Sequence, residues 1–277
     1  MKILSCGAGM QSTALALMAC ENVREPWKYP LVPVYDLIAF CDLGMEPPWV
    51  MDQVEFIRVA CQEAGIRFEI LRSPLYEDYM RDFGRRRVVS IPFWTVDEAG
   101  KKGKMMRNCT MDYKIGLIQK YVRWELLGYS KGQRTRPEDI KAHEMHIGFS
   151  TEEKRRCSEN PHRMFINRFP LVEMGLERKD NYAYIKDVWG LETKASACTF
   201  CPFHRNYFFA DLKQNHTGQY QDLVEFDEML EREQPNTKIR SKLYISRSRK
   251  RIADLTQEEC LDPECFDYKG TQIWNGF

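Results

Sequence analysis

Residues 3–18 read ILSCGAGMQSTALALM, a short apolar run followed by two glycines and then a longer apolar run. The first run is typical of a buried strand, and the run that begins at Ala14 is typical of a helix. Gly7 and Gly9 allow positive φ values and a close approach of the backbone to a ligand. The stretch therefore predicts a strand, a tight glycine turn and a helix N-terminus, which together favour an anion.

Two hydroxyl residues follow the turn, which matches neither of the common phosphate loops. Ser12 and Thr13 are good N-cap residues and can add hydroxyl donors. No lysine follows Gly9, as a P-loop NTPase would require, and Ser12 occupies the third glycine position of the dinucleotide fingerprint. On these residues alone, an anion-binding loop and an ordinary strand–turn–helix junction both stay open.

The length and composition are those of a globular protein. At 277 residues the chain can bury a full core, as one large domain or as a domain with an appendage. Its hydrophobic share of 43% and charged share of 29% are ordinary. The net charge of +1 provides no global attraction for nucleic acid, so any such role must rest on local patches.

The sequence also favours a cytoplasmic location. No apolar run approaches the ~20 residues of a membrane span, so no membrane contact is expected. The N-terminus enters the first strand directly, without a signal-peptide pattern. Ten cysteines without a secretory signal indicate a reducing compartment, where cysteines are metal ligands, catalytic thiols or core residues.

Strands and helices alternate in the first part of the chain. Residues 36–41 and 67–71 are apolar runs, and residues 49–64 between them carry apolar side chains at helical spacing. This order predicts a parallel α/β sheet with ligands beyond the carboxyl ends of its strands. Further along we expect an irregular excursion over 73–108, a helix over 112–127, a strand over 143–147, a capped helix start at 151–153, an extended piece over 165–171, a helix over 179–189 and a helical region to about 233.

Five stretches of the chain form a recognisable series of motifs, and they are residues 7–12, 41–47, 107–114, 147–156, and 169–171 together with 198–202. They resemble, in the same order, motifs of the PP-loop ATP pyrophosphatases and phosphoadenosine-phosphosulfate (PAPS) reductases. The glycine turn is similar to the SGGxDS loop of that family, and the resemblance extends over roughly residues 2 to 205.

This resemblance implies a Rossmann-like, adenine nucleotide alpha hydrolase-like (HUP) fold, which is an α/β parallel-sheet core with a helical, cysteine-bearing C-terminal extension. We expect residues 1–195 to form the PP-loop nucleotide-binding domain. Residues 196–277 would form the C-x-x-C metal-binding and helical extension, packed on that domain.

The resemblance further implies that the loop holds the pyrophosphate end of ATP through backbone N–H groups and the Ser12 hydroxyl. Gln11 stands where the family has aspartate, which removes a carboxylate from the Mg²⁺–phosphate site. Asp42 and Glu46 could take over Mg²⁺ or ribose contacts, or could be ordinary solvated carboxylates. The ATP-contacting candidates are Ser5, Gly7, Ala8, Gly9, Gln11, Ser12, Thr13, Asp42, Gly44 and Gly148.

The catalytic candidates include the cations that could meet phosphate or sulfate oxygens. Lys114, Arg155 and Arg156 have the charge for this, and arginine adds a planar fork. The other interpretation of these three is that they form salt bridges on helix surfaces. The catalytic candidates are Ser12, Gln11, Lys114 and Arg155.

The cysteines form the second strong pattern. Cys198 and Cys201 have metal-ligand spacing, and soft thiolates suit an iron–sulfur cluster or zinc. The resemblance places a third ligand at Cys109 and implies a [4Fe-4S] cluster close to the nucleotide. Cys265 is the first choice for the fourth ligand, and zinc completed by His204 or a pair of unliganded core thiols are the competing interpretations. The other candidates for the fourth ligand are Cys260 and Cys157.

Two reaction classes fit the resemblance. In the first, ATP adenylates a carbonyl oxygen of an acceptor, pyrophosphate leaves, and sulfur or an amine then displaces AMP. The acceptor would be a nucleobase or nucleic acid, and a sulfur-donor protein and a second copy of the chain are candidate partners. The second class is a PAPS or APS reductase, whose ECG(L/I)H motif is matched poorly by residues 259–261. A nucleotide-binding module without catalysis is the third interpretation.

A basic stretch and one tryptophan are left over by these assignments. Residues 240–251 carry six basic side chains and no acidic one, and could follow a polyanion such as tRNA or DNA, or form a solvated basic surface. Trp94 could stack on a base, cover the adenine or pack in the core.

Overall fold

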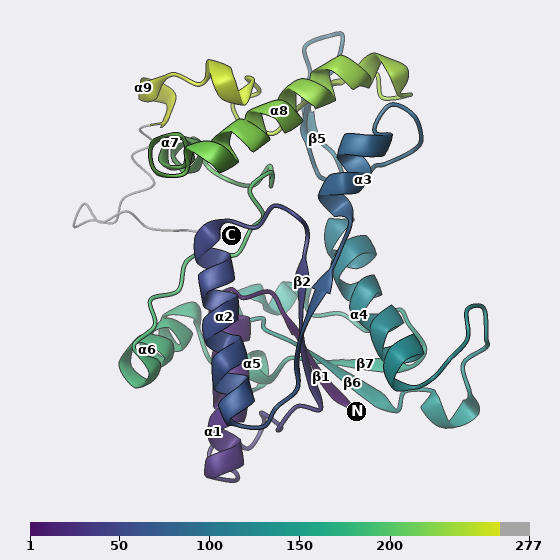
Figure 1. Cartoon of the computed structure of the whole chain (residues 1–277), viewed down its shortest axis with the longest axis vertical. Helices are drawn as coiled ribbons and strands as arrows, with labels where there is room; N and C mark the ends of the chain where they lie inside the picture. The colour runs from purple at the N-terminus through teal and green to yellow at the C-terminus, as the bar shows by residue number, and fades with distance from the viewer. Residues whose placement is uncertain (261–277) are drawn as a thin grey trace. The chain divides into compact units, whose positions relative to one another are not determined.

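The computed structural model describes residues 1–260. Its larger sheet has five parallel strands in the order β3-β2-β1-β6-β7 (Figure 1). This confirms the α/β class with a parallel sheet. The strands are β1 (Lys2–Cys6), β2 (Leu37–Asp42), β3 (Phe68–Arg72), β6 (His143–Ile147) and β7 (Phe165–Arg168).

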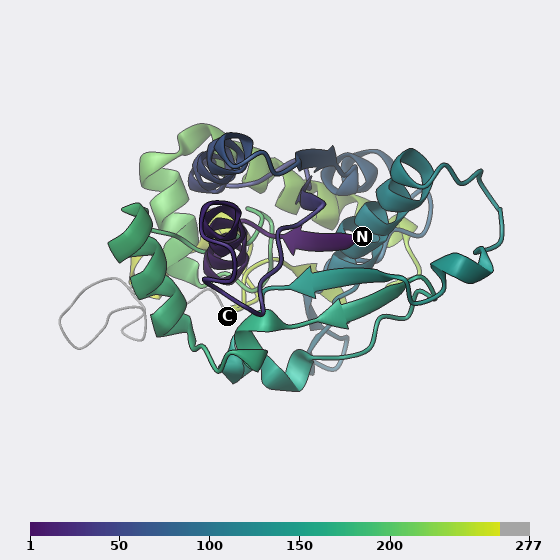
Figure 2. The same cartoon turned by 90° about the horizontal axis from the view of Figure 1, so that it is seen from below.

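Helices cover both faces of this sheet, which is why its strands are apolar on both faces. On one side, α1 (Met10–Arg24) packs against both α2 (Pro48–Glu63) and α6 (Arg178–Trp189). On the other side lies α4 (Gly116–Tyr121), as Figures 1 and 2 show. There the alternate strand residues Ile3, Leu37, Ala39, Cys41, Met145 and Phe165 form a buried cluster with Ile118 and Val122.

Three predicted elements differ in detail. The helix expected over 112–127 is a π-helix (η1, Thr110–Ile115), then α4, then a second π-helix (η2, Val122–Leu126). The expected capped helix start is a 3₁₀ helix, η4 (Thr151–Arg156), whose N-cap Ser150 makes no side-chain capping bond. The extended piece over 165–171 ends early, because α5 (Pro170–Glu173) begins at a proline, whose fixed φ suits the first turn of a helix.

The described chain divides into two compact units. The first consists of Met1–Asp42, Pro48–Arg72 and Ile115–Ser196, and the second of Leu43–Pro47, Ser73–Lys114 and the described residues from Ala197 onward. Residues 43–47 and 73–114 were expected in the nucleotide-binding domain, whereas their hydrogen bonds join them to C-terminal residues. The N–H of Thr199, for example, donates to the carbonyl of Met45 at 2.8 Å.

The second unit is built on an aromatic core and a small antiparallel sheet. Its 73–108 segment is not an irregular excursion, because it forms α3 (Leu75–Asp82), β4 (Trp94–Val96) and β5 (Lys102–Lys104). The sheet order is β5-β4-β8, with β8 (Lys242–Tyr244) supplied from near the C-terminus. The remaining α-helices described in this unit are α7 (Asn206–Asn215), α8 (Thr217–Glu233) and α9 (Gln257–Cys260). Tyr79, Phe93, Phe200 and Phe226 are buried at its centre, with the rings of Phe200 and Phe226 5.2 Å apart.

The helices within residues 1–260 do not include a membrane span. No helix there combines the length and the apolar composition needed to cross a bilayer.

Candidate functional site

The glycine turn lies at the point where the strand order of the parallel sheet reverses. The chain leaves the central strand β1 toward β2 and β3 on one side, and later returns to β6 and β7 on the other. Gly7 follows the end of β1, and Gly148 follows the end of the neighbouring β6. Ligands of open α/β sheets bind at this reversal, beyond the carboxyl ends of the strands. The first unit therefore places the two glycine positions where such a fold holds its ligand.

The turn is closed by Ser12, which does not cap the helix. Helix α1 begins at Met10 with Gly9 as its N-cap, and no side chain caps it, so the prediction of a Ser12 or Thr13 cap is wrong. The Ser12 Oγ accepts the N–H of Gly7 at 3.1 Å and donates to the carbonyl of Gly9 at 3.1 Å. Thr13 is fully buried, and its Oγ1 has no hydrogen-bond partner within the described chain.

Positive φ occurs at Ala8 and at neither glycine of the turn. Ala8 has a φ of 52°, a left-handed conformation that costs an L-residue roughly 1–2 kcal/mol. Gly9 allows close packing instead, because a Cβ there would lie 2.7 Å from the Oγ of Ser196 and would force that side chain to rotate. The expected positive φ of the glycines is thus corrected: one glycine serves close packing, and alanine makes the left-handed turn.

Two residues of α2 hold the turn from the side, and neither was among the predicted site residues. The buried Gln53 donates from Nε2 to the carbonyl of Ala8 at 2.6 Å and to that of Lys194 at 3.2 Å. The indole N–H of Trp49 donates to the carbonyl of Ala195 at 3.0 Å. Segment 194–196 is therefore fixed beside the turn. One feature of the sequence could have identified Gln53: it is a polar residue on the otherwise apolar face of α2, one residue before Val54.

Gly148 lets the end of β6 approach the first turn of α1. A Cβ at this position would lie 2.7 Å from the backbone N of Ser12 and 2.9 Å from the carbonyl carbon of Gln11. These are backbone atoms that cannot rotate away. Gly148, predicted as an ATP contact, thus has a steric role in forming the same loop.

Gln11 has a partner that explains why a carboxylate is absent from its position. Its Nε2 donates to Oε2 of Glu153 at 2.9 Å and lies 3.5 Å from Oγ of Ser150. The Glu153 carboxylate also pairs with Arg156, whose guanidinium lies 4.3 Å from the ring centroid of Phe149. A carboxylate at position 11 would face the carboxylate of Glu153, whereas the glutamine amide can donate to it. Glu153 and Ser150 were not among the predicted site residues.

The other predicted nucleotide residues fall into both units. Ser5 in β1 and Asp42 at the end of β2 are half-buried, and Arg155 is exposed, all in the first unit. Gly44 and Lys114 belong to the second unit. At Gly44, φ is +93° and a Cβ would meet Tyr76 at 3.1 Å, so this glycine serves a turn against α3.

The C-x-x-C residues form a tight turn in the second unit. The N–H of Cys201 donates to the carbonyl of Cys198 at 2.9 Å, which holds the two cysteines in one turn. The neighbouring Cys198 thiol and the positive charge of Arg107 lower the pKa of Cys201 to about 7. The neighbouring Cys201 thiol, together with burial, raises the pKa of Cys198 well above its ordinary value. Cys201 is therefore partly ionised at neutral pH, and the thiolate is the form that binds soft metals.

Arg107 brings the third predicted cysteine into this group. The charge of its guanidinium interacts with the thiols of Cys201, Cys109 and Cys198. Lys114 also lowers the pKa of Cys201 through its charge. The catalytic candidate Lys114 therefore lies near the thiols and belongs to the second unit, whereas the glycine turn belongs to the first.

Backbone hydrogen bonds position Cys109. Its N–H donates to the carbonyl of Ser90 at 2.9 Å, and the Ser90 hydroxyl donates to Asp112 at 2.8 Å. The phenol oxygen of the buried Tyr79 accepts the N–H groups of Ser90 and Ile91 at 2.9 and 3.0 Å. The segment that carries Cys109 is thus anchored on α3.

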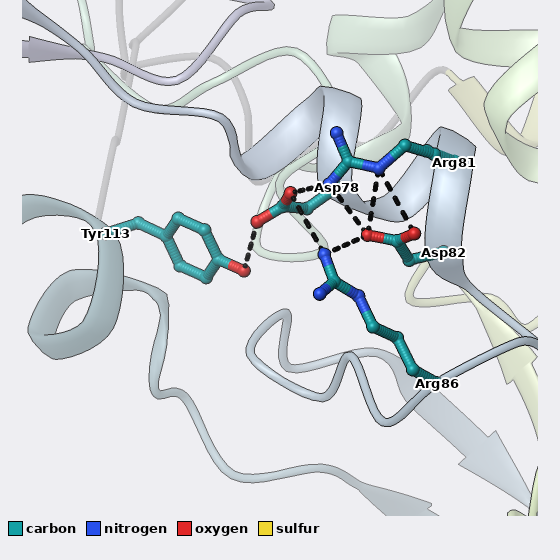
Figure 3. A network of polar contacts seen from close by, with 5 residues as sticks. All are labelled: Asp78, Arg81, Asp82, Arg86 and Tyr113. Atoms are coloured by element: carbon teal, nitrogen blue, oxygen red, sulfur yellow. Dashed lines mark hydrogen bonds and ion pairs between the residues drawn. The ribbon is translucent and has the colours of Figure 1, made fainter.

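An ionic network adds a second anchor between η1 and α3 (Figure 3). The Tyr113 phenol donates to Asp78 at 3.1 Å, and burial together with that carboxylate raises the pKa of the tyrosine. Arg81 bridges Asp78 at 2.5 Å and Asp82 at 2.7 Å, and Arg86 pairs with Asp82. These contacts connect residues 78–86 to the segment that ends at Lys114.

The described thiols supply part of a metal site. Cys109, Cys198 and Cys201 are soft donors gathered around one guanidinium, which fits thiolate ligation of iron or zinc. Within residues 1–260, however, no group of three histidine, cysteine, aspartate or glutamate side chains is already arranged to hold a metal ion. The predicted fourth ligand, Cys265, lies outside the described residues.

His204 is engaged by the backbone of the C-x-x-C turn. Its Nε2 lies 2.9 Å from the carbonyl oxygen of Cys198, and its ring stacks on Phe208 with centroids 3.4 Å apart. Burial lowers the pKa of His204 to about 4. A neutral histidine that donates to a carbonyl is a structural group, so the structure does not favour the Cys₃His zinc arrangement.

The buried His204 predicts a loss of stability in acid. Its folded pKa of about 4 lies below the ordinary 6.5, so the unfolded chain binds the extra proton as the pH falls below 6.5. Between pH 7 and pH 5 this should remove about 2 kcal/mol of unfolding free energy. Urea unfolding of the wild-type chain and of His204→Gln at both pH values tests it. An equal pH dependence in the two chains would contradict this assignment.

Comparisons with known proteins give limited similarity. No protein-family model matches the chain, and no curated protein matches it. Among solved structures, the chain is similar to the U34-tRNA thiolase NcsA from Methanococcus maripaludis with its [4Fe-4S] cluster, with 14% identity and a TM-score of 0.38. The match covers 83% of this chain and 73% of that one.

Proposed function

We propose that this chain is an ATP-dependent enzyme that adenylates a carbonyl oxygen of a nucleobase or nucleic acid, forming pyrophosphate and then AMP. In the first step the acceptor oxygen attacks the α-phosphorus of ATP, and the bond to the β-phosphate oxygen breaks. In the second, sulfur or an amine attacks the activated carbon, and AMP leaves with the acceptor oxygen.

One observation carries this proposal: the closed glycine turn of the first unit lies at the switch point of the parallel sheet. The N-terminus of α1 directly follows the turn, and the first N–H groups of a helix favour an anion. In the proposed reaction these groups orient the pyrophosphate of ATP and stabilise its charge as it leaves. Gln53 and Gly148 keep the turn in this shape.

The cysteines support the sulfur-transfer form of the reaction. We propose that Cys109, Cys198 and Cys201, with Cys265 as the fourth candidate, hold a [4Fe-4S] cluster. If only the three described cysteines bound it, such a cluster would leave one iron open and so supply a site for the sulfur atom. The residues that support this are the thiolate of Cys201 and the Arg107 guanidinium, which offsets the negative charge of the thiolates.

The reductase alternative receives no support from the described residues. Its nucleophile would be Cys260, which is buried at the end of α9. Burial raises the pKa of this thiol, whereas a nucleophilic cysteine needs a lowered pKa and access to its substrate.

Exchange of labelled pyrophosphate into ATP tests the proposed function. We expect exchange with the wild-type chain when bulk cellular RNA or denatured genomic DNA is added, and none without acceptor. Absence of exchange together with sulfite release from PAPS would establish the reductase instead. Binding of ATP without turnover of either acceptor, with the metal site filled, would leave a nucleotide-binding module.

The metal proposal predicts a coloured protein. Purified without oxygen, the wild-type chain should show broad visible absorption from iron–thiolate charge transfer, with about four irons per chain. Cys198→Ala and Cys201→Ala should each lose this absorption. Cys20→Ala is the matched control, because Cys20 is buried on α1 beside Cys61 and should keep it. A colourless wild-type chain with one zinc per molecule would refute the cluster.

A further inference from the structure

The three-stranded sheet of the second unit has one face made of basic and aromatic side chains. The central strand β4 pairs with β5 on one side and β8 on the other, both antiparallel. Directly opposed residues, and residues two apart in a strand, share a face. By this register the face, called the basic face below, consists of Trp94, Val96, Lys102, Lys104, Lys242 and Tyr244.

The basic face is open, while the opposite face of the same sheet packs into the unit. The side chains of Lys102, Lys104 and Lys242 are exposed, and those of Trp94 and Tyr244 are half-buried. Leu243, which alternates to the other face, is fully buried. A sheet with one buried apolar face normally has a mixed polar outer face. This outer face has three lysines and two aromatic rings.

Trp94 is held rigidly at the centre of this face. Its indole N–H donates to the carbonyl of Pro202 at 2.6 Å, and its ring meets Phe203 edge to face at 6.4 Å. Arg249 is fixed too, because its guanidinium donates to the carbonyl of Gly103 at 3.4 Å and to that of Thr95 at 3.3 Å.

Further cations gather over the Trp94 ring. The charged groups of Lys104, Arg249 and Arg247 lie 5.5, 5.2 and 5.9 Å from its centroid. Lys104 also lies 4.6 Å from the centroid of Phe203, with Arg107 at 5.6 Å on the same ring. Mutual repulsion of these cations would disfavour the arrangement unless an anion joined them.

Within residues 1–260 these charges are not neutralised by carboxylates. The neighbouring Lys250 and Arg251 pair with Glu259 and Asp227, but Lys102, Lys104, Lys242, Arg247 and Arg249 form no such ion pair in that part of the chain. In the β4–β5 turn, Asp97 accepts the backbone N–H groups of Ala99 and Lys101. The basic face therefore has unmet positive charge around an anchored aromatic ring.

We propose that the basic face binds single-stranded nucleic acid, with bases stacked against Trp94 and Tyr244 and phosphates contacting the lysines and Arg247. Rings flanked by cations suit a strand whose bases are unstacked, because every base has a π-face and every linkage has a charge. Bases in a duplex are not available for such stacking. The proposal rests on the proposed function only in naming this strand as the reaction's acceptor.

Fluorescence anisotropy with the full chain tests the surface without ATP. The probes are labelled single strands of mixed-sequence RNA and DNA, about 20 nucleotides long, which exceeds the site of one such module. The triple variant Lys102→Gln/Lys104→Gln/Lys242→Gln should bind at least tenfold more weakly. Its plot of log K against log [KCl] should be shallower by about 2, since each lost phosphate contact removes about 0.7.

Two further variants separate charge from stacking. The control Lys120→Gln/Lys131→Gln/Lys179→Gln removes the same charge from exposed lysines of the first unit and should keep wild-type affinity. Trp94→Ala should weaken binding roughly tenfold with an unchanged salt slope, because stacking adds no counterion release. Thermal melting of each variant shows whether it is folded, and the lysine triple changes only exposed side chains.

Several results would overturn the inference. One is an equal loss of affinity in the two triple lysine variants. A second is tighter binding of a duplex than of either single strand. A third is that anionic vesicles or polyglutamate compete for the protein as strongly as single strands do. A preference between the RNA and DNA probes would identify which strand is the partner. Acceptor-dependent pyrophosphate exchange without single-strand binding here would contradict this surface alone, and binding without exchange would contradict the proposed function alone.

Discussion

Gly148→Ala should lower both the stability of the first unit and its pyrophosphate exchange. The new Cβ would meet the backbone N of Ser12 at 2.7 Å and its Cα at 3.0 Å. Either β6 or the start of α1 must move, and overpacking of this kind costs about 1–3 kcal/mol. Because the displaced atoms belong to the proposed pyrophosphate loop, exchange should fall at least tenfold. Thermal melting and the exchange assay measure the two effects.

The matched control for this change is Gly218→Ala. Gly218 lies in α8 with no heavy atom within 4 Å of the added Cβ. Alanine in a helix should be neutral or stabilising by about 0.5–1 kcal/mol. Wild-type exchange and stability in Gly148→Ala would show that β6 does not pack against the turn as described.

Gln11→Glu should be the second severe change. In the wild-type chain the Gln11 Nε2 lies 2.9 Å from Oε2 of Glu153 and donates to it. The substitution replaces this amide donor by a carboxylate that faces the Glu153 carboxylate. The Glu153 side chain is only 13% exposed, so solvent screens the repulsion poorly. The lost hydrogen bond and the like charges should together cost about 2–4 kcal/mol. Exchange should fall in parallel, because Gln11 lies in the first turn of α1.

A pH series and a compensating variant test the cause. Two facing carboxylates raise each other's pKa, so the pair regains a proton as the pH falls and the deficit should be smaller at pH 5 than at pH 8. The double variant Gln11→Glu/Glu153→Gln restores one donor and one acceptor and should recover most of the loss. If the double variant is as unstable as the sum of its parts, the two side chains do not interact.

Local patterns in the sequence were sufficient for the elements of the parallel sheet. The apolar run at 36–41 forms β2, and the segment with helical spacing at 49–64 forms α2. A strand buried on both faces is apolar throughout, whereas a helix buried on one face has apolar residues every three or four positions. The glycine turn after β1 was predicted for a similar reason. The residue with the left-handed conformation was not predicted, because the glycine pattern marks the turn but does not indicate that Ala8 has the positive φ.

The missed features depend on contacts between distant parts of the chain. Gln53 and Glu153 meet the turn from positions 45 and 142 residues away from their partners Ala8 and Gln11. The strands β4 and β8 are three residues long and pair across more than a hundred residues, so no local period reveals them. The thiols at 198 and 201 were predicted from their spacing, whereas the Arg107 that lies among them was not.

The most direct test of the proposed reaction is the identity of the products formed from ATP labelled at its α-phosphate and, in a parallel assay, at its γ-phosphate. With bulk RNA or denatured DNA as acceptor and sulfide or ammonia as the attacking nucleophile, the wild-type chain should form AMP and pyrophosphate in equal amounts, and Gly218→Ala should do the same. Gly148→Ala and Gln11→Glu should form little of either. Formation of ADP and phosphate, or of AMP at the same rate without acceptor, would contradict the proposed reaction.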